Sequence, residues 1–132
     1  MDKKYNVLVV DDSPICRQIV EIYLNKLYEN KVNLKFAENG QEALDLVNNS
    51  MTNGGLDLIL MDIKMPVLDG FDSKDKILEK YREQKLNPPK IVAFTAYVMH
   101  KDKEKIIHSG FDGYLSKPLT LENYKTLDKY LN

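Results

Sequence analysis

The chain has 132 residues, a length that fits one globular domain with one hydrophobic core. Apolar residues make up 43% of it and charged residues 30%, and the formal net charge is −1. So weak a global charge gives no indication of a surface that binds nucleic acid or membranes, so any charge-based chemistry must come from local clustering. The single cysteine, Cys16, excludes an intramolecular disulfide and agrees with a reducing compartment.

The N-terminal region contains an apolar run of only four residues, 7–10. A signal peptide needs a longer apolar segment, and a membrane helix a much longer one. We therefore expect a cytoplasmic protein with no membrane insertion. No effector domain follows Asn132, so we expect the output to come from a partner or from sequence outside this chain.

Five short apolar segments alternate with five segments of helical periodicity. The segments expected to form strands are mostly continuous apolar runs, typical of strands buried on both faces, whereas 32–37 is less apolar and is expected near a sheet edge. The predicted elements are strand 7–10, helix 14–29, strand 32–37, a helix from Asn39-Gly40 to Asn53-Gly54-Gly55, strand 58–61, a helix between Gly70 and Pro88, strand 91–94, helix 98–109, strand 113–116 and helix 121–131. This alternation predicts a single α/β domain over residues 1–132, with a doubly wound parallel sheet.

The first predicted helix carries two apolar stripes. Ser13 is the expected N-cap, and Pro14 takes the first helical position. The stripe expected to face the core consists of Cys16, Val20, Tyr23, Leu24 and Leu27. Ile15, Ile19 and Ile22 form a second stripe, in which Ile19 lies at the core edge and the other two are exposed.

Charged and polar residues follow four of the predicted strands. In an open parallel sheet these strand ends meet at one edge, where ligands bind. The residues are Asp11-Asp12, Asp62, Thr95 and Lys117. Three carboxylates repel one another unless cations lie among them, and Mg²⁺ or Mn²⁺ together with Lys117 would balance them. A carboxylate in such a site can attack phosphorus and form an aspartyl phosphate, whose charge the metal, Lys117 and the Thr95 hydroxyl would neutralise.

Six short strings occur in order along the chain, each near the end of a predicted strand. They are Val7-Leu8-Val9-Val10-Asp11-Asp12, the run 37–44, the run 57–66, Asp69-Gly70, Thr95-Ala96 and Gly113-Tyr114-Leu115-Ser116-Lys117-Pro118. Together they resemble the receiver domain of two-component response regulators over essentially the whole chain. The run Thr95-Ala96-Tyr97-Val98-Met99 is similar to receivers that work with hybrid sensor kinases.

The resemblance implies a flavodoxin-like (βα)5 fold with strand order 2-1-3-4-5. It also implies Mg²⁺-dependent transfer of a phosphoryl group from a phosphohistidine donor to Asp62. Asp12 would bind the metal directly and Asp11 mainly through water, with Asp62 and the backbone carbonyl of Lys64 as further ligands. The chain would take part in its own phosphorylation and dephosphorylation and would not be a turnover enzyme on a separate substrate.

The resemblance further implies a switch. Lys117 would pair with the phosphoryl group, and the Lys117-Pro118 peptide would be cis. Thr95 would hydrogen-bond the phosphoryl group, and Tyr114 would turn inward as Thr95 moves. That motion would change the surface formed by the fourth helix, the fifth strand and the fifth helix.

Partners follow from the same resemblance. A histidine kinase or a histidine phosphotransfer domain would donate the phosphoryl group, and an effector or a hybrid kinase would receive the signal. A phosphorylation-dependent homodimer is a further expectation. Ile15, Ile19 and Ile22 are candidates for docking a helical phosphodonor, although single exposed isoleucines are common and the two interpretations have equal weight. Lys64 and Tyr97 flank the expected water entrance and are candidates for tuning the lifetime of the aspartyl phosphate.

Several of these residues also have simpler interpretations. Asp11-Asp12 alone would suit the N-terminus of the helix that follows. Tyr114 would suit a packed strand, and Cys16 a small buried apolar position. His100 and His108 lie in a charged helical stretch, where solvated side chains are more common than ligands or phosphodonors.

Three other functions fit the sequence less well. A phosphatase or phosphotransferase of the haloacid-dehalogenase type places its nucleophile in an Asp-x-Asp motif after the first strand, whereas the acids there are adjacent in this chain. A flavodoxin-like cofactor binder would need a loop that cradles phosphate, and Asp11-Asp12 would repel one. A degenerate receiver that acts only as a protein-binding module is disfavoured because every residue that the chemistry needs is present.

Overall fold

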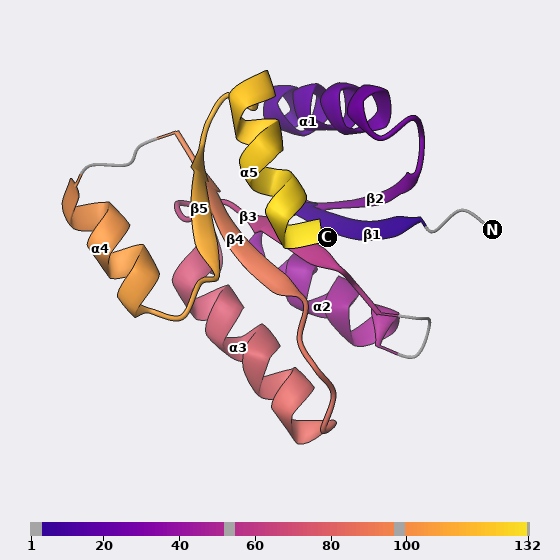
Figure 1. The fold of residues 1–132 in the computed structure, drawn as a ribbon. Coiled ribbons are helices and arrows are strands. Elements are labelled where there is room, and N and C mark those ends of the chain that lie inside the picture. The colour runs from indigo at the N-terminus through magenta and orange to yellow at the C-terminus, as the bar shows by residue number, and fades with distance from the viewer. Residues whose placement is uncertain (1–3, 52–54, 97–99, 132) are drawn as a thin grey trace.

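A computed structural model describes residues 4–51, 55–96 and 100–131 as one sheet with helices on both faces (Figure 1). The elements are β1 (Tyr5–Val10), α1 (Pro14–Leu27), β2 (Val32–Ala37), α2 (Gly40–Ser50), β3 (Leu58–Met61), α3 (Gly70–Glu83), β4 (Lys90–Thr95), α4 (His100–His108), β5 (Gly113–Ser116) and α5 (Leu121–Leu131).

All five strands are parallel and lie in the order β2-β1-β3-β4-β5. The predicted fold class and strand order are therefore confirmed, and β2 is at an edge as its composition indicated. The chain order reverses between β1 and β3, which are neighbours in the sheet. In sheets of this kind the crevice at such a reversal is where ligands bind.

Two apolar clusters, one on each face, hold the sheet between its helices. Leu8 and Val10 of β1 belong to the cluster with α2, α3 and α4, whereas Val7 and Val9 belong to the cluster with α1 and α5. All four of these side chains are buried. Burial on both faces explains why the strands are continuous apolar runs and do not alternate with polar residues.

Three helices begin with a side-chain cap at the same end of the sheet. The Ser13 hydroxyl accepts the Cys16 amide at 3.2 Å, Asn39 accepts the Glu42 amide at 2.8 Å, and Asp69 accepts the Asp72 amide at 2.9 Å. Such caps satisfy amides that have no partner within the helix. The predicted cap and proline at the start of α1 are confirmed.

Some predicted boundaries were wrong by a few residues. Helix α1 ends at Leu27 and not near residue 29, because Glu29 and Asn30 have φ of 52° and 64° and cannot continue a helix. Helix α2 ends at Ser50, and residues 52–54 lie outside the described part of the chain. The described part of α4 begins at His100, so the predicted start at residue 98 also lies outside it.

Candidate functional site

Three carboxylates meet at the carboxyl end of the sheet. Asp11, Asp12 and Asp62 each offer one oxygen, and these oxygens lie within 4.8 Å of one another. Asp11 and Asp12 follow β1, and Asp62 follows β3. The two strands are paired, and the Asp62 amide donates to the Val10 carbonyl at 2.9 Å. The backbone ladder thus places the acids side by side at the point where the strand order reverses.

Lys117 lies among these acids. Its Nζ is 3.1 Å from Asp62 Oδ2 and also pairs with Asp11 Oδ2. The Lys117-Pro118 peptide is cis, as expected, and the Lys117 amide donates to the Thr95 carbonyl at 3.0 Å. The ammonium comes from the loop after β5 and bridges the ends of β1 and β3.

The two buried acids are held in place by backbone amides. Asp11 is 1% exposed, and its Oδ1 accepts the Ser13 amide at 2.9 Å. Asp62 is 7% exposed, and its Oδ1 accepts the Ile63 amide at 2.8 Å. Asp12, in contrast, is exposed to solvent. The site therefore has two buried carboxylates held by backbone amides and a third, from Asp12, that is open to solvent.

The electrostatics of the site favour a further cation. Burial raises the pKa of Asp62, the Lys117 charge opposes that effect, and the Asp11 charge adds to it. Burial lowers the pKa of Lys117, but its contacts with Asp11 and Asp62 outweigh this effect and the net shift is upward. With Lys117 protonated, three negative charges and one positive charge leave an excess of two negative charges. Carboxylate oxygens with this excess fit a hard divalent cation such as Mg²⁺.

Thr95 and Tyr114 lie in separate hollows. Thr95 is buried at the end of β4 and lines a small cavity with Ile63 and Ile106. Tyr114 of β5 is half-buried and lines a groove of about 490 Å³ on the surface formed by α4, β5 and α5. The Nζ of Lys103 lies 5.3 Å from the centre of the Tyr114 ring.

Other predicted residues lie around this centre. Lys64 is exposed and lines the same cavity as Thr95. Tyr97 lies outside the described residues, and so does the side chain of His100, whereas His108 is exposed.

The second stripe of α1 is exposed as predicted. The exposed fraction is 70% for Ile15 and 59% for Ile22, while Ile19 is half-buried. Ile15 and Ile19 line an apolar groove of about 270 Å³ that Lys117 also borders. The stripe is therefore continuous with the rim of the carboxylate site. On the core stripe, Val20 and Leu24 are buried, whereas Cys16, Tyr23 and Leu27 are only half-buried.

Two residues near the site were missed by the sequence analysis. Arg17 Nη1 donates to the Asp11 carbonyl at 2.6 Å, and its other terminal nitrogen lies 3.6 Å from Glu38 Oε1. Gly70 lies so close to the Asp62 backbone that an added Cβ would be 2.3 Å from the Asp62 carbonyl oxygen. The position of Arg17, one turn into α1 and close to Asp11 in the sequence, could have indicated its contact. The string Asp69-Gly70 does not by itself indicate the close approach of Gly70 to Asp62.

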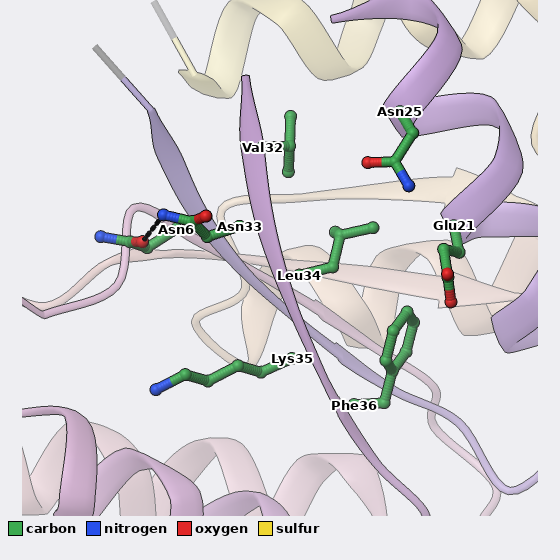
Figure 2. A pocket seen from close by; sticks show the side chains of 8 residues that line it. All are labelled: Asn6, Glu21, Asn25, Val32, Asn33, Leu34, Lys35 and Phe36. Atoms are coloured by element: carbon green, nitrogen blue, oxygen red, sulfur yellow. Dashed lines mark hydrogen bonds between the residues drawn. The ribbon is translucent and has the colours of Figure 1, made fainter. Parts of the chain in front are cut away.

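A further groove, of about 520 Å³, lies beside the edge strand β2 (Figure 2). Leu34 and Phe36 point from β2 toward Glu21 and Asn25 of α1, and a 3.1 Å hydrogen bond joins the side chains of Asn6 and Asn33. None of the three clustered carboxylates lines this groove. We therefore place the chemistry at the carboxylates and not in this larger hollow.

The fold and the carboxylate–lysine cluster define a class of protein, namely flavodoxin-like α/β domains with an acidic ligand site at the point where the strand order reverses. Within that class, the chain belongs to the response regulator receiver domain family, whose model matches residues 7–127. It is therefore a receiver domain of the kind found in two-component and phosphorelay signalling.

The chain is similar to several curated proteins. It is 36% identical to the osmolarity two-component system protein SSK1 of Saccharomyces cerevisiae, over 89% of this chain and 19% of that protein. It is 33% identical to hybrid signal transduction histidine kinase H of Dictyostelium discoideum, over 88% of this chain and 8% of that protein. The chain thus spans less than a fifth of the length of these relatives.

Solved structures have the same fold. A receiver domain of the Saccharomyces cerevisiae response regulator Ssk1, crystallised with the histidine phosphotransfer signaling protein Ypd1, matches with 34% identity and a TM-score of 0.80, over 96% of this chain and 88% of that chain. The Vibrio cholerae chemotaxis protein CheY4 matches with 28% identity and a TM-score of 0.78, over 97% and 99% of the two chains. No helix in the described part of the chain has the length and apolar character needed to cross a bilayer.

Proposed function

We propose that this chain is the phosphoacceptor module of a phosphorelay and that Asp62 accepts the phosphoryl group. The main support is the environment of Asp62, a largely buried carboxylate that lies beside two further acids. One of its oxygens accepts a hydrogen bond from the Ile63 amide, and the other forms an ion pair with Lys117. An Asp62 oxygen would attack phosphorus while the P–N bond to the donor imidazole breaks and the imidazole leaves. The acceptor carboxylate is oriented in advance, which reduces the entropic cost of the transfer.

The proposed metal is Mg²⁺, held by Asp11, Asp12, Asp62 and the backbone carbonyl of Lys64. When bound, it would neutralise charge on the phosphoryl oxygens. Lys117 already bridges Asp11 and Asp62, so it can shift one of its contacts to the incoming phosphoryl group without moving far. The Thr95 hydroxyl would donate to a third oxygen.

The proposed output is a change in the surface formed by α4, β5 and α5. Thr95 and Tyr114 lie on neighbouring strands, and Tyr114 now lines a groove on that surface. Movement of Thr95 toward the phosphoryl group would open space for the Tyr114 ring, and the groove would change shape. An effector or a second copy of the chain would recognise the new surface. Light scattering with and without beryllofluoride, which stands in for the phosphoryl group, tests whether the chain dimerises.

The phosphodonor is proposed to be a histidine kinase or a histidine phosphotransfer protein that docks on α1. Support comes from Ile15, which lines a groove that Lys117 borders, and from the exposed Ile22 on the same stripe of α1. The similar receiver that was crystallised with a phosphotransfer protein gives further support. Replacing both isoleucines with serine should slow transfer from a histidine donor but not from acetyl phosphate. Ile107→Ser, on α4 and 56% exposed, is the matched control. Equal transfer rates in all variants would remove the docking proposal.

The lifetime of the aspartyl phosphate is proposed to depend on Tyr97 and Lys64, as their positions two residues after Thr95 and Asp62 indicate. A bulky Tyr97 would shield phosphorus from water, so Tyr97→Ala should lose the phosphoryl group faster. An unchanged rate of loss would contradict the shielding role. We further propose that residues 1–132 act as one module in the cytoplasm, where a free thiol such as Cys16 stays reduced.

The decisive experiment is incubation with acetyl phosphate, with and without Mg²⁺, followed by mass spectrometry of the intact protein. We expect a gain of one phosphoryl group that requires Mg²⁺, is released by hydroxylamine as an acyl phosphate is, and is absent from Asp62→Asn. Asp45→Asn, an exposed aspartate on α2, is the control and should still be phosphorylated. A product that resists hydroxylamine, or one that persists in Asp62→Asn, would overturn the assignment.

A further inference from the structure

Arg17 links the loop after β1 to the loop after β2. Its Nη1 donates to the backbone carbonyl of Asp11 at 2.6 Å, and its Nη2 lies 3.6 Å from Glu38 Oε1. The Arg17 side chain is 17% exposed, whereas that of Glu38 is 66% exposed. One nitrogen of the planar guanidinium therefore donates to the backbone oxygen of a buried residue, and the other forms an ion pair with a carboxylate at the surface.

The Asp11 carbonyl is part of the peptide group that leads into Asp12. Because a peptide group is planar, the direction of this carbonyl also sets the direction of the Asp12 amide and the point where the Asp12 Cα leaves the plane. Asp11 is held at its other polar atoms by the Ala37 carbonyl, the Ser13 amide and Lys117. Arg17 supplies the remaining contact, the one that fixes the peptide plane between the two acids.

Asp12 depends on this plane more than its neighbours do. It is exposed, and among the residues that the structure describes its carboxylate has no hydrogen bond or ion pair. Its oxygen nevertheless lies within 4.8 Å of the ligand oxygens of Asp11 and Asp62. Its position in the cluster must therefore come from its backbone, and Arg17 is a main constraint on that backbone.

We infer that Arg17 is a positioning residue for the metal site. It orients the Asp11–Asp12 peptide so that the otherwise unsupported Asp12 carboxylate points at the same space as Asp62. This inference rests on the proposed Mg²⁺ site. Glu38 acts one step further out, by keeping the guanidinium in the plane needed to reach the Asp11 carbonyl.

A role through charge alone predicts the opposite effect. A cation near the acids lowers their attraction for Mg²⁺, so removing the Arg17 charge would then tighten metal binding. Loss of positioning weakens binding instead. Arg17→Met removes both the charge and the hydrogen bond and keeps an apolar stem, and Arg17→Lys keeps the charge but has no planar fork to reach both oxygens.

The test is Mg²⁺ titration of the full chain by calorimetry or NMR. We expect both variants to bind Mg²⁺ about 10- to 100-fold more weakly than the wild type, which is the usual effect of removing a residue that orients a metal ligand. Arg82→Met, an exposed arginine in the last turn of α3, is the matched control and should bind like the wild type. In the metal-free protein, the carbonyl ¹³C resonance of Asp11 should shift in both Arg17 variants and not in the control.

The outcomes separate the possibilities. Tighter or unchanged binding in Arg17→Met, or unchanged binding in Arg17→Lys, overturns the positioning role. If Arg17→Met does not fold, Arg17→Lys and the Asp11 resonance decide the matter. A wild type that binds no Mg²⁺ would reject the proposed function itself, and so is distinguishable from a failure of this inference.

Discussion

The ionised Asp62 side chain destabilises the folded protein because it is largely buried. Burial raises the pKa of this carboxyl group, despite the opposing charge of Lys117. An acid whose pKa is higher in the folded state lowers stability at any pH above both pKa values. That cost disappears as the pH falls below the pKa of the unfolded chain, because the group is then protonated in both states.

We therefore expect Asp62→Asn to be more stable than the wild type at neutral pH without Mg²⁺. The gain is the free-energy cost of ionising the buried Asp62 carboxyl group in the folded state, and it should appear as a higher urea midpoint. Lys117 remains paired with Asp11 in this variant, so no buried cation is left alone. Urea unfolding at about pH 7 measures the gain, and at about pH 4, near the unfolded pKa of an aspartate, the gain should shrink. A variant that is less stable than the wild type at neutral pH would contradict the argument.

Cys16 is a second residue whose chemistry depends on its surroundings. Burial, followed by its contact with Asp11, raises the pKa of the thiol to about 12 from 9.0. The thiolate is the reactive form, so we expect alkylation by iodoacetamide at about pH 8 to be at least about tenfold slower in the folded protein than in urea. Mass spectrometry over time gives both rates. Equal rates would mean that the thiol is not shielded.

At the scale of elements, Gly70 at the start of α3 is a point of close approach. An added Cβ would lie 2.3 Å from the Asp62 carbonyl oxygen and 2.9 Å from the Ile63 Cα, and these are backbone atoms that cannot rotate away. The Gly70 amide also donates to the Ile63 carbonyl at 2.8 Å. This hydrogen bond joins the start of α3 to the residue that follows Asp62. Helix α3 is therefore coupled directly to the position of Asp62.

Gly70→Ala is expected to lower the free energy of unfolding by about 1–3 kcal/mol, as overpacked sites do, and to weaken Mg²⁺ binding by displacing Asp62. Gly55→Ala is the informative control, because Gly55 has φ of +73° but open space at its Cβ. That variant should lose about 1 kcal/mol through backbone strain alone and should bind Mg²⁺ normally. Denaturant unfolding and calorimetry separate the two effects, and equal metal binding in both variants would rule out the coupling.

How far the sequence predicts these elements depends on how local each signal is. The strands, the cap at Ser13 and the acids at the strand ends are encoded in runs of a few residues, and the structure confirms their positions. The Arg17 contact with Asp11 depends on a side-chain rotamer, and the fit at Gly70 depends on the distance between α3 and β3. Neither quantity is a property of a short string. The predicted end of α1 was wrong for a similar reason. Its left-handed residues are Glu29 and Asn30, so no glycine in the sequence marks the end of the helix.

At the scale of the whole molecule, the end of α4 is attached to α3 through a buried cation. Lys74 of α3 is 1% exposed, its Nζ donates to the Ser109 carbonyl just after α4, and it lies 2.7 Å from Asp75 Oδ1 and 5.2 Å from the centre of the Phe111 ring. A cation at the C-terminus of a helix interacts favourably with its dipole. No pattern in the sequence indicates that this lysine, which lies on a highly charged helix, is buried. The contact therefore anchors the C-terminal end of α4.

Lys74→Met tests whether this anchor holds α4 in place. Methionine fills a similar volume and needs no counter-charge, so overall stability should change by only about 1 kcal/mol, because an apolar replacement offsets much of the lost pairing. The Ser109 carbonyl, however, loses its donor, and the amides of α4 should exchange with deuterium faster while those of α1, α2 and β1 keep their protection. Lys76→Met, on the exposed face of the same helix, is the control and should leave exchange in α4 unchanged. Faster exchange in every element would indicate general destabilisation, and unchanged exchange in α4 would show that other contacts hold this helix on the domain.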